Sequence, residues 1–451
     1  MKNILILGAG LSSSSLIRYL LQHSENLNIK IRIVDQNLEN IFVKTNQHPR
    51  SEALVFDALD KEKRLFEIEK ADIVISMLPA KYHVEVAKDC LEKNKHLITP
   101  SYVTNEMKAL SIEAEKKGLI FLNEIGVDPG IDHMSACKIM DNVKEKGGRI
   151  LEFKSYCGGL IAPISDDNPW HYKFTWNPRN VVIAGFNSTS RYVENNEFKY
   201  IPYHRLFTQV EEINIPEYGA FEAYANRDSL SYQKVYDLEN SPTLLRGTLR
   251  KKGFCEAWNI FVQLGMTNPD FVLDDSENLT PRKFLNVFLP YHPSLTIEEK
   301  FIRFLGPQKH LFPLFEYLDL FSSKSTIGIP NASAAVILEH ILISKWKLNP
   351  NDKDMLVMFH HFVVEFNHQK QIIQSYFVTI GENNLYTAMS NTVGLPMAIC
   401  TKLIIQNKIK QRGVILPISK EIYVPVLYEL EDYGIRFVEK QMEINSKIYN
   451  S

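Results

Sequence analysis

The sequence predicts an α/β protein, in which an N-terminal doubly wound parallel sheet is followed by a mixed α/β domain with a helical insert. Three observations predict this class. Strand and helix signals alternate through the first 125 residues, a glycine-rich turn joins the first strand to the first helix, and the middle of the chain mixes strands with a long helical stretch. Such alternation is typical of parallel sheets, whose strands are joined by helical crossovers.

The first 125 residues supply the elements of the parallel sheet. Short apolar runs suit strands that are buried on both faces. Apolar residues spaced three and four positions apart predict the helices between them. The expected strands are Asn3–Leu7, Ile29–Val34, Leu54–Phe56, Ala71–Leu78, His96–Ile98 and Leu119–Asn123, and the expected helices are Leu11–Gln22, Tyr82–Lys93 and Glu106–Lys117.

The turn after the first strand reads Gly8-Ala9-Gly10-Leu11-Ser12-Ser13. This spacing, between a strand and a helix, predicts a Rossmann-type site for a dinucleotide. Gly8 permits the tight turn, and Gly10 lets the backbone approach the pyrophosphate. Ser13 stands where a third Gly or Ala is usual, and is small enough for close helix packing. Leu11 and Ser12 open the helix whose N–H groups would meet the anion.

Asp35 closes the second expected strand. A carboxylate there accepts hydrogen bonds from the adenosine ribose hydroxyls and repels a 2′-phosphate, which favours NAD, with NADP still possible. Met77 and Leu78 end a later strand on the same sheet edge, so we expect them to line the nicotinamide side. The alternative is a pair of turn glycines with an exposed aspartate.

The domain prediction places the dinucleotide-binding domain at residues 1–125 and a substrate-binding α/β domain at 126–390. A helical insert is expected at about 254–330, and the segment from about 390 to 451 is expected to pack back on the first domain. The remaining expected strands are Glu152–Cys157, Val181–Ala184, Glu222–Tyr224, Ile435–Val438 and a hairpin of Met355–Phe366 with Gln371–Ile380, and the expected late helices are Thr392–Ile405 and Val426–Tyr433.

Composition narrows the functional classes. The net charge of −2 gives no reason to expect nucleic-acid binding, and no apolar stretch approaches the length of a membrane span. The five cysteines show no CxxC spacing, which favours a reducing, cytoplasmic compartment over disulfides or zinc. His360 and His361 point to opposite faces of an expected strand, so we predict no metal.

Three long segments beyond the first domain carry a family resemblance. They are Asn123–His133 (NEIGVDPGIDH), Ser155–Leu160 (SYCGGL) and Asp167–Trp176 (DNPWHYKFTW). They resemble the glutamate-forming saccharopine dehydrogenases, also called saccharopine reductases, of lysine metabolism. Shorter matches at Asn226–Ser229, Arg246–Arg250 and Thr392–Pro396 extend the resemblance over nearly the whole chain.

The resemblance implies an NAD(P)-dependent oxidoreductase, a homodimer, that interconverts saccharopine with glutamate and α-aminoadipate semialdehyde. A hydride leaves the carbon beside a secondary amine, and the imine is then hydrolysed. NADP-using members carry an arginine where this chain has Asp35. Two alternatives stay open: a related amino-acid or carboxy-polyamine dehydrogenase, and a non-catalytic NAD-binding protein.

The resemblance also implies the residues nearest the reaction. Asp128 is expected near the substrate amine, with Ser101 and Tyr102 beside the substrate and Cys157 lining the pocket. Each has a plainer interpretation. Asp128 could cap a helix that has Pro129 at its first position, Tyr102 could cover the sheet, and Cys157 could be a buried thiol.

Three carboxylates on saccharopine require fixed cations, and the arginine fork suits them. The resemblance assigns this role to Arg227, Arg246 and Arg250, with the Thr248 hydroxyl beside them, although the run Arg250-Lys251-Lys252 is also typical of a solvated face. It further assigns cofactor contacts to Thr99, Val127, Pro129 and Asn177.

Overall fold

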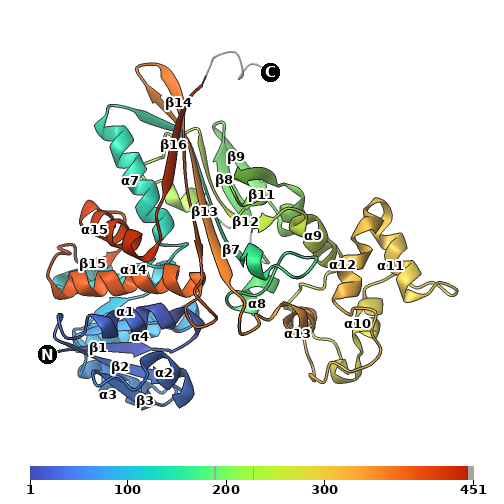
Figure 1. Cartoon of the computed structure of the whole chain (residues 1–451), viewed down its shortest axis with the longest axis horizontal. Helices are drawn as coiled ribbons and strands as arrows, with labels where there is room; N and C mark the ends of the chain where they lie inside the picture. The colour runs from blue at the N-terminus through green and yellow to red at the C-terminus, as the bar shows by residue number, and fades with distance from the viewer. Residues whose placement is uncertain (187–188, 227, 445–451) are drawn as a thin grey trace. The chain divides into compact units, whose positions relative to one another are not determined.

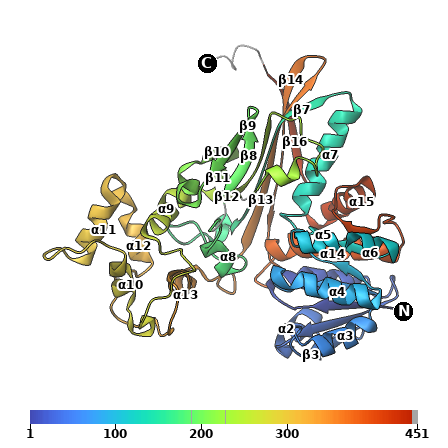
Figure 2. The ribbon, with the colours of Figure 1, turned by 180° about the vertical axis from the view of Figure 1, so that it is seen from behind.

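The computed structural model describes residues 1–186, 189–226 and 228–444. The chain forms two compact units (Figures 1 and 2). The first unit comprises Met1–Ile150 and Asp354–Ser451, and the second comprises Leu151–Lys353. The second unit is therefore an insertion in the first. Both expected domain boundaries, at residues 125 and 390, fall inside the first unit.

A parallel sheet forms the centre of the first unit, with seven strands in the described part of the chain. Their order is β15-β6-β5-β4-β1-β2-β3. The strands β1 to β6 follow the Rossmann order, and β15 is added next to β6. The predicted α/β class and parallel sheet are confirmed. The strands are β1 (Lys2–Leu7), β2 (Ile29–Asp35), β3 (Ser51–Val55), β4 (Ile73–Ser76), β5 (His96–Ile98), β6 (Ile120–Leu122) and β15 (Gly413–Ile415).

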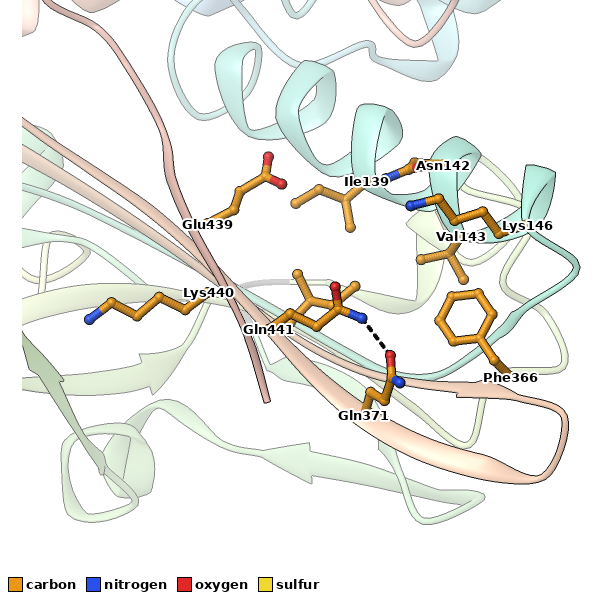
Figure 3. A pocket seen from close by; sticks show the side chains of 10 residues that line it. Ile139, Asn142, Val143, Lys146, Phe366, Gln371, Glu439, Lys440 and Gln441 are labelled. Atoms are coloured by element: carbon orange, nitrogen blue, oxygen red, sulfur yellow. Dashed lines mark hydrogen bonds between the residues drawn. The ribbon is translucent and has the colours of Figure 1, made fainter. Parts of the chain in front are cut away.

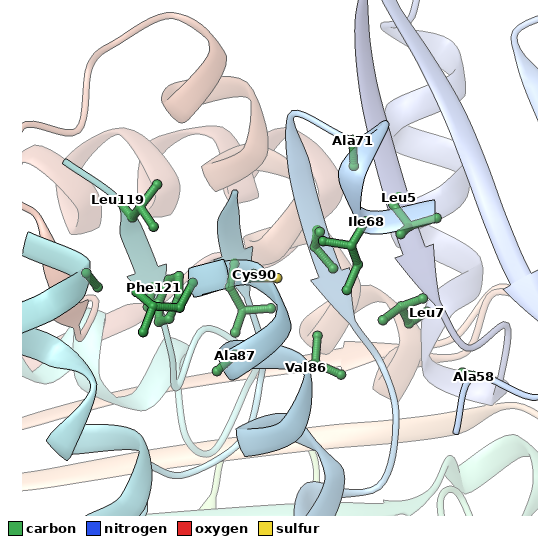
Figure 4. Close-up of a cluster of buried hydrophobic side chains, with 14 of the residues drawn as sticks. Leu5, Leu7, Ala58, Ile68, Ala71, Val86, Ala87, Cys90, Leu119 and Phe121 are labelled. Carbon is green, nitrogen blue, oxygen red and sulfur yellow. The ribbon is translucent and has the colours of Figure 1, made fainter. Parts of the chain in front are cut away.

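Helices pack on this sheet and bury its strands. Figure 4 shows part of one apolar core, in which Leu5 and Leu7 of β1 and Phe121 of β6 lie with Val86 and Cys90 of α4, all fully or almost fully buried. Burial of each large apolar side chain contributes about 1.5–3 kcal/mol. The helices of this part are α1 (Ser14–Gln22), α2 (Leu38–Thr45), α3 (Lys61–Glu69), α4 (His83–Lys93), α5 (Asn105–Ala109) and α6 (Ser111–Lys116).

The C-terminal segment joins this sheet through α14 (Ala388–Ile405) and α15 (Lys420–Leu430). A Cβ added to Gly394 of α14 would lie 2.7 Å from the backbone N of Leu16 in α1, so the two helices cross closely. The Ser15 hydroxyl donates to Asn391 Oδ1 at 2.5 Å. By length and composition α14 could span a membrane, contrary to the sequence expectation, but 78% of it is buried inside the structure.

The first unit also contains α7 (Ile131–Glu145), the hairpin of β13 (Asp354–Phe366) and β14 (Gln369–Ile380), and the edge strand β16 (Val438–Glu443). The hairpin turn has two residues, Asn367 and His368, with φ of 49° and 68°, and β14 begins at Gln369, two residues before the expected Gln371. A cavity of 390 Å³ lies between α7, the hairpin and β16 (Figure 3). None of the predicted site residues lines it.

The second unit contributes the strands β10-β11-β12-β7, in that order, to a mixed sheet with nine strands among the described residues, and β12 pairs with β7 in parallel and with β11 in antiparallel fashion. Its helical part begins at α9. The elements are β7 (Arg149–Ile161), β8 (Ser190–Glu194), β9 (Glu197–Ile201), β10 (Glu211–Ile215), β11 (Gly219–Ala225), β12 (Thr243–Lys251), α9 (Phe254–Leu264), α10 (Pro281–Val287), α11 (Ile297–Leu305), α12 (Phe312–Tyr317) and α13 (Ala334–Trp346).

Several expected elements need correction. The helix expected at Glu106–Lys117 is divided into α5 and α6 at Leu110, and the helices α2 and α3 were not expected. The strand at Val181–Ala184 is wrong, because these residues follow an Asn177 N-cap and Pro178 and form the end of α8 (Pro178–Val182) and its cap. The helix expected from Val426 starts at Lys420, since Pro425 is tolerated within it. The strand expected at Ile435–Val438 lies at Val438–Glu443 instead.

Candidate functional site

The dinucleotide turn has the shape that the motif requires. Gly8 adopts φ +99°, and a Cβ there would lie 3.2 Å from the Met77 carbonyl oxygen. Gly10 is extended, and nothing lies within 4 Å of its added Cβ, so space is open where the helix starts. The Ser13 hydroxyl donates to the Gly10 carbonyl at 2.8 Å. The turn therefore fits a pyrophosphate against backbone N–H groups, with Ser13 bracing it.

Asp35 at the end of β2 is held against this turn. Its Oδ2 accepts a hydrogen bond from the Ala9 N–H at 2.8 Å, and its Oδ1 accepts from the Asn37 N–H at 2.9 Å and the Asn40 amide at 3.2 Å. Lys44 lies in the same region, but its side chain is buried and its ammonium donates to the Asn40 carbonyl at 3.3 Å. The carboxylate is thus held beside the glycine turn, at the end of β2, where it could accept hydrogen bonds from an adenosine ribose.

The other strand ends of the sheet carry the remaining cofactor residues of this unit. Met77 and Leu78 follow β4, and the Met77 N–H donates to the Leu7 carbonyl at 2.9 Å, which keeps them beside the glycine turn. Thr99 follows β5, is fully buried, and accepts from the Ser101 N–H at 3.4 Å. Carboxyl ends of parallel strands are where ligands bind in such sheets.

A short loop after β5 holds Ser101, Tyr102 and Val103 close to Asp128. The Tyr102 hydroxyl donates to Asp128 Oδ1 at 2.9 Å. The Val103 N–H donates to Glu124 Oε1 at 2.9 Å, and the Glu124 N–H donates to the Ser101 carbonyl at 3.2 Å. The structure therefore brings together the predicted Tyr102 and Asp128, and Glu124 holds the loop between them.

The segment from Val127 to Gly130 leads into α7, and Asp128 does not cap that helix. The N-cap is Gly130, whose N–H donates to Asp132 Oδ1 at 2.6 Å. The capping interpretation of Asp128 is wrong, and its carboxylate lies against Tyr102 instead. Val127 is buried, and Pro129 accepts from the Gly126 N–H at 2.9 Å.

Sequence reasoning missed His83, in the first turn of α4. Its Nδ1 lies 2.9 Å from the hydroxyl of Ser76, which ends β4, and its Nε2 lies 2.8 Å from the Ser101 hydroxyl. Burial lowers the pKa of His83 to about 4, so the ring is neutral near pH 7. No local sequence pattern marks this histidine, because its two serine partners lie at the end of β4 and in the loop after β5.

In the second unit, the predicted substrate residues share one face of the sheet. Arg246, Thr248 and Arg250 alternate along β12, so their side chains emerge on the same side. Cys157 of β7 pairs in register with Thr248. Strands in register present paired residues on one face, so this face combines cations, a hydroxyl and a thiol.

The two arginines on that face are largely buried. The Arg246 guanidinium lies 4.1 Å from the centre of the Tyr232 ring. Arg250 is 6% exposed, its Nη1 donates to the Leu249 carbonyl at 2.9 Å, and its Nε has no acceptor among the described residues. A buried cation with a spare donor suits a carboxylate. Lys252 is solvated and forms an ion pair with Glu212 at 2.6 Å. Within the run Arg250-Lys251-Lys252, Lys252 is therefore a surface charge, whereas Arg250 is buried.

The remaining predicted residues are less informative. Arg227 lies outside the described residues. Asn177 caps α8 by accepting from the Asn180 N–H at 3.4 Å. The side chain of Cys157 is 9% exposed, and this value fits both a thiol that lines a pocket and a buried thiol. In the described ranges, no three His, Cys, Asp or Glu residues are grouped as metal ligands would be, and His360 binds the Ser135 hydroxyl at 2.7 Å.

The parallel sheet, its glycine turn and Asp35 define a Rossmann-type dinucleotide-binding protein. Two family models together match nearly the whole chain. Residues 4–122 match the saccharopine dehydrogenase NADP binding domain, and residues 126–435 match the saccharopine dehydrogenase C-terminal domain. The chain belongs to the saccharopine dehydrogenase family.

Individual relatives agree with this assignment. The L-glutamate-forming, NADP(+) saccharopine dehydrogenases of Schizosaccharomyces pombe and Saccharomyces cerevisiae are each 32% identical, over 98% and 97% of this chain and 99% of theirs. The apo structure of the L-Glu-forming enzyme of Saccharomyces cerevisiae matches 98% of this chain and 100% of its own, at 31% identity and a TM-score of 0.88.

Longer relatives contain a matching part. The α-aminoadipic semialdehyde synthase of Arabidopsis thaliana is 34% identical over 86% of this chain, and the mitochondrial synthase of Mus musculus is 32% identical over 97%. This chain spans 38% and 47% of their lengths.

Proposed function

We propose that the chain is an L-glutamate-forming saccharopine dehydrogenase, an oxidoreductase that acts on a CH–NH group of saccharopine. The observation that carries this proposal is the hydrogen bond from Tyr102 to Asp128 at 2.9 Å, at the sheet edge where the dinucleotide turn opens. The full-length likeness to fungal enzymes of that name supports it.

The residues of the chain suit each part of this reaction. Saccharopine, water and NAD⁺ give glutamate, α-aminoadipate semialdehyde, NADH and a proton; bound NAD⁺ supplies the hydride acceptor. Asp128, fixed by the Tyr102 hydroxyl, would bind the secondary amine and receive its proton. Arg246 and Arg250, with Thr248, would bind carboxylates. Cys157 requires no covalent role in hydride transfer.

A steady-state assay tests this function. The purified chain should produce NADH and glutamate from saccharopine, and Asp128→Asn should lower kcat/KM at least about a hundredfold, because general acid–base and positioning groups contribute on the order of 10²–10⁴. Asp72→Asn is the matched control, because Asp72 precedes β4 and so lies at the opposite end of that strand from the glycine turn. A wild-type chain that turns over neither saccharopine nor glutamate with the semialdehyde would overturn the proposal.

We further propose that this chain prefers NAD to NADP, unlike the fungal relatives named for NADP(+). The support is Asp35, whose carboxylate is held at the ribose side of the turn. Next in sequence come the uncharged Gln36 and Asn37. A carboxylate about 4 Å from a phosphate is opposed by about 4 kcal/mol at an effective dielectric constant near 20.

The cofactor proposal is tested by the ratio of kcat/KM for NAD to that for NADP. We expect a ratio of at least about ten, falling to near one or below in Asp35→Ala because the repulsion is removed. Asp72→Asn should leave the ratio unchanged. A wild-type preference for NADP would contradict the proposal directly.

Two further proposals concern assembly and compartment. We propose a homodimer, supported by the family resemblance and by β16, whose six residues are all exposed at a sheet edge. We also propose a cytoplasmic, reducing location, supported by the five cysteines, all of them buried. Light scattering at several concentrations tests the first, and fractionation of the host cell tests the second, since some relatives are named mitochondrial.

A further inference from the structure

Three polar side chains of the first unit form one chain of hydrogen bonds. It begins at the Ser76 hydroxyl, which is fully buried at the end of β4. It passes through both ring nitrogens of His83, which is 3% exposed, over 2.9 Å and 2.8 Å. It ends at the hydroxyl of Ser101, which is half-buried in the loop that also carries Tyr102.

The charge state of the ring decides what this chain can do. Burial lowers the pKa of His83 to about 4, so near pH 7 one ring nitrogen donates and the other accepts. With the proton on Nε2, Ser76 donates to Nδ1 and the Ser101 oxygen accepts from the ring. The Ser101 hydroxyl must then direct its own hydrogen elsewhere. The ring thereby sets whether Ser101 is a donor or an acceptor.

The loop of Ser101 is tied down at other points as well. Tyr102 is bound to Asp128 at 2.9 Å, and the Val103 N–H is bound to Glu124 at 2.9 Å. These bonds fix the backbone path and the tyrosine, but not the rotation of the Ser101 hydroxyl. Among the described residues, the side chain that hydrogen-bonds to that hydroxyl is His83, at 2.8 Å.

We propose that His83 is a positioning residue that turns the Ser101 hydroxyl outward as a hydrogen-bond donor to a carboxylate of the amino-acid substrate. The inference rests on the proposed function, because saccharopine supplies the carboxylate. A donor suits an anionic partner, whereas the opposite tautomer would present only an acceptor there. His83 itself touches neither substrate nor cofactor in this scheme.

Two substitutions separate the ends of the imidazole. In His83→Asn the amide reaches the Nδ1 position and so keeps a group facing Ser76, but it does not reach Ser101. In His83→Gln the amide reaches the Nε2 position and can donate to Ser101. We expect His83→Asn to raise the KM for saccharopine about tenfold, the usual scale of one lost hydrogen bond, with kcat within about threefold. His83→Gln should restore the KM to within about threefold of the wild type.

A double-mutant cycle tests whether the effect passes through Ser101. Ser101→Ala should raise the KM by a similar factor, and adding His83→Asn to it should change the KM no further. The dissociation constant for NADH, measured by fluorescence titration, should stay at the wild-type value in every variant, because a loss confined to fold stability or nucleotide binding would move it. If His83→Asn does not fold, His83→Gln alone still tests the proposal, because a tenfold rise in its KM with normal NADH binding would contradict a role carried by the Nε2 position.

The outcomes are distinct. If the wild-type chain does not turn over saccharopine, the proposed function itself is wrong. A chain that turns it over, but in which His83→Asn keeps the wild-type KM, or in which the two substitutions are additive, overturns the role of His83. A His83→Gln variant that binds NADH normally and is as impaired as His83→Asn overturns it as well.

Discussion

At the scale of single residues, the most constrained position near the site is Gly130, the N-cap of α7. Its φ is +146°, and a Cβ there would lie 2.1 Å from the Gly126 carbonyl oxygen. No side chain fits that space, because the neighbour is backbone and cannot rotate away. The glycine therefore sets the path of the chain from Asp128 into α7.

We predict that Gly130→Ala destabilises the chain by at least about 3 kcal/mol, since both the backbone conformation and the overlap oppose it. Gly118→Ala is the matched control: its φ is +68°, but nothing lies within 4 Å of the added Cβ. It should cost only about 1 kcal/mol. Urea unfolding followed by circular dichroism measures both, and equal losses would show that the overlap is relieved at little cost.

A second residue-scale prediction concerns the tyrosine partner of Asp128. Tyr102→Phe removes only the hydroxyl group, which donates the 2.9 Å hydrogen bond to Asp128. We expect kcat/KM for saccharopine to fall about tenfold or more, because a charge-assisted hydrogen bond contributes about 1.5–3 kcal/mol. Tyr82→Phe, on the neighbouring turn, is the control. Full activity in Tyr102→Phe would assign this tyrosine to packing over the sheet.

Sequence reasoning identified some of these residues and missed others for a physical reason. The glycines of the turn and Asp35 have a local backbone signature, so they could be predicted from spacing. Asp128 needed the resemblance, because its sequence context equally suits a helix cap. His83 and Glu124 carry no local signal, since each acts through a partner that only the fold brings near.

At the scale of elements, the crossing of α1 and α14 joins the glycine turn to the C-terminal segment. Gly394 lies at the crossing, and a Cβ there would be 2.7 Å from the Leu16 backbone N. Ser15 adds a side-chain bond to Asn391. The serines after the turn thus have a packing role that their sequence context did not reveal.

We predict that Gly394→Ala lowers the free energy of unfolding by about 1–3 kcal/mol, because it overpacks the crossing. The sign is informative, since Gly→Ala inside an unconstrained helix stabilises by about 1 kcal/mol. The variant should also bind NADH more weakly, as α1 continues from the dinucleotide turn. Chemical denaturation and NADH titration check both effects, and a gain in stability would refute the close crossing.

A buried acid at the start of β13, Asp354, faces the N-terminus of α14. Asp354 accepts from the Ala388 and Met389 N–H groups at 2.6 and 2.9 Å, yet burial raises the pKa of its carboxyl to about 6. An unfolded aspartate has a pKa of about 3.9. Between these values the folded chain holds a proton that the unfolded chain releases, so this group makes the chain less stable as the pH rises from 4 to 6.

We predict that Asp354→Asn flattens the dependence of unfolding free energy on pH between 4 and 6. The change in unfolding free energy that this substitution removes is at most about 3 kcal/mol, because folding raises the pKa of Asp354 by about two. Asp57→Asn, an exposed position, should leave the curve unchanged. Urea denaturation at several pH values measures this, and an unchanged slope in Asp354→Asn would show that another group causes it.

Elements were predictable where the local pattern agreed with the tertiary environment. In the first 125 residues the expected strands lie close to those observed, because buried parallel strands need continuous apolar runs, whereas the helices α2 and α3 were not predicted. Val181–Ala184 looked like a strand from its β-branched residues, but the Asn177–Pro178 start signal prevailed. The register of β16 was not predictable, since all its residues are exposed and no apolar face fixes it.

At the scale of the whole molecule, the chain leaves the first unit after Ile150 and returns at Asp354. No composition shift marks these two points in the sequence, so the expected boundaries differed. The glycine turn belongs to the first unit, and we expect the two units to respond differently to a ligand that binds this turn.

We predict that NADH at a hundred times its dissociation constant stabilises the strands β1, β2, β4 and β5 by about 2.7 kcal/mol. The hairpin of β10 and β11 in the second unit should be unaffected, because its hydrogen bonds are made within that unit. Hydrogen exchange with mass spectrometry reports both regions in one experiment. Equal protection of the two would show that the units open together.

The inserted position of the second unit also sets the order of events on the ribosome. The strands and helices before Ile150 emerge first, but α14 and β15, which complete their sheet unit, follow the whole of the second unit. At about 5–20 residues per second, this delay is on the order of 10–50 s. During that time the apolar face of α1 that meets α14 is uncovered, so the nascent chain is a candidate client for a chaperone.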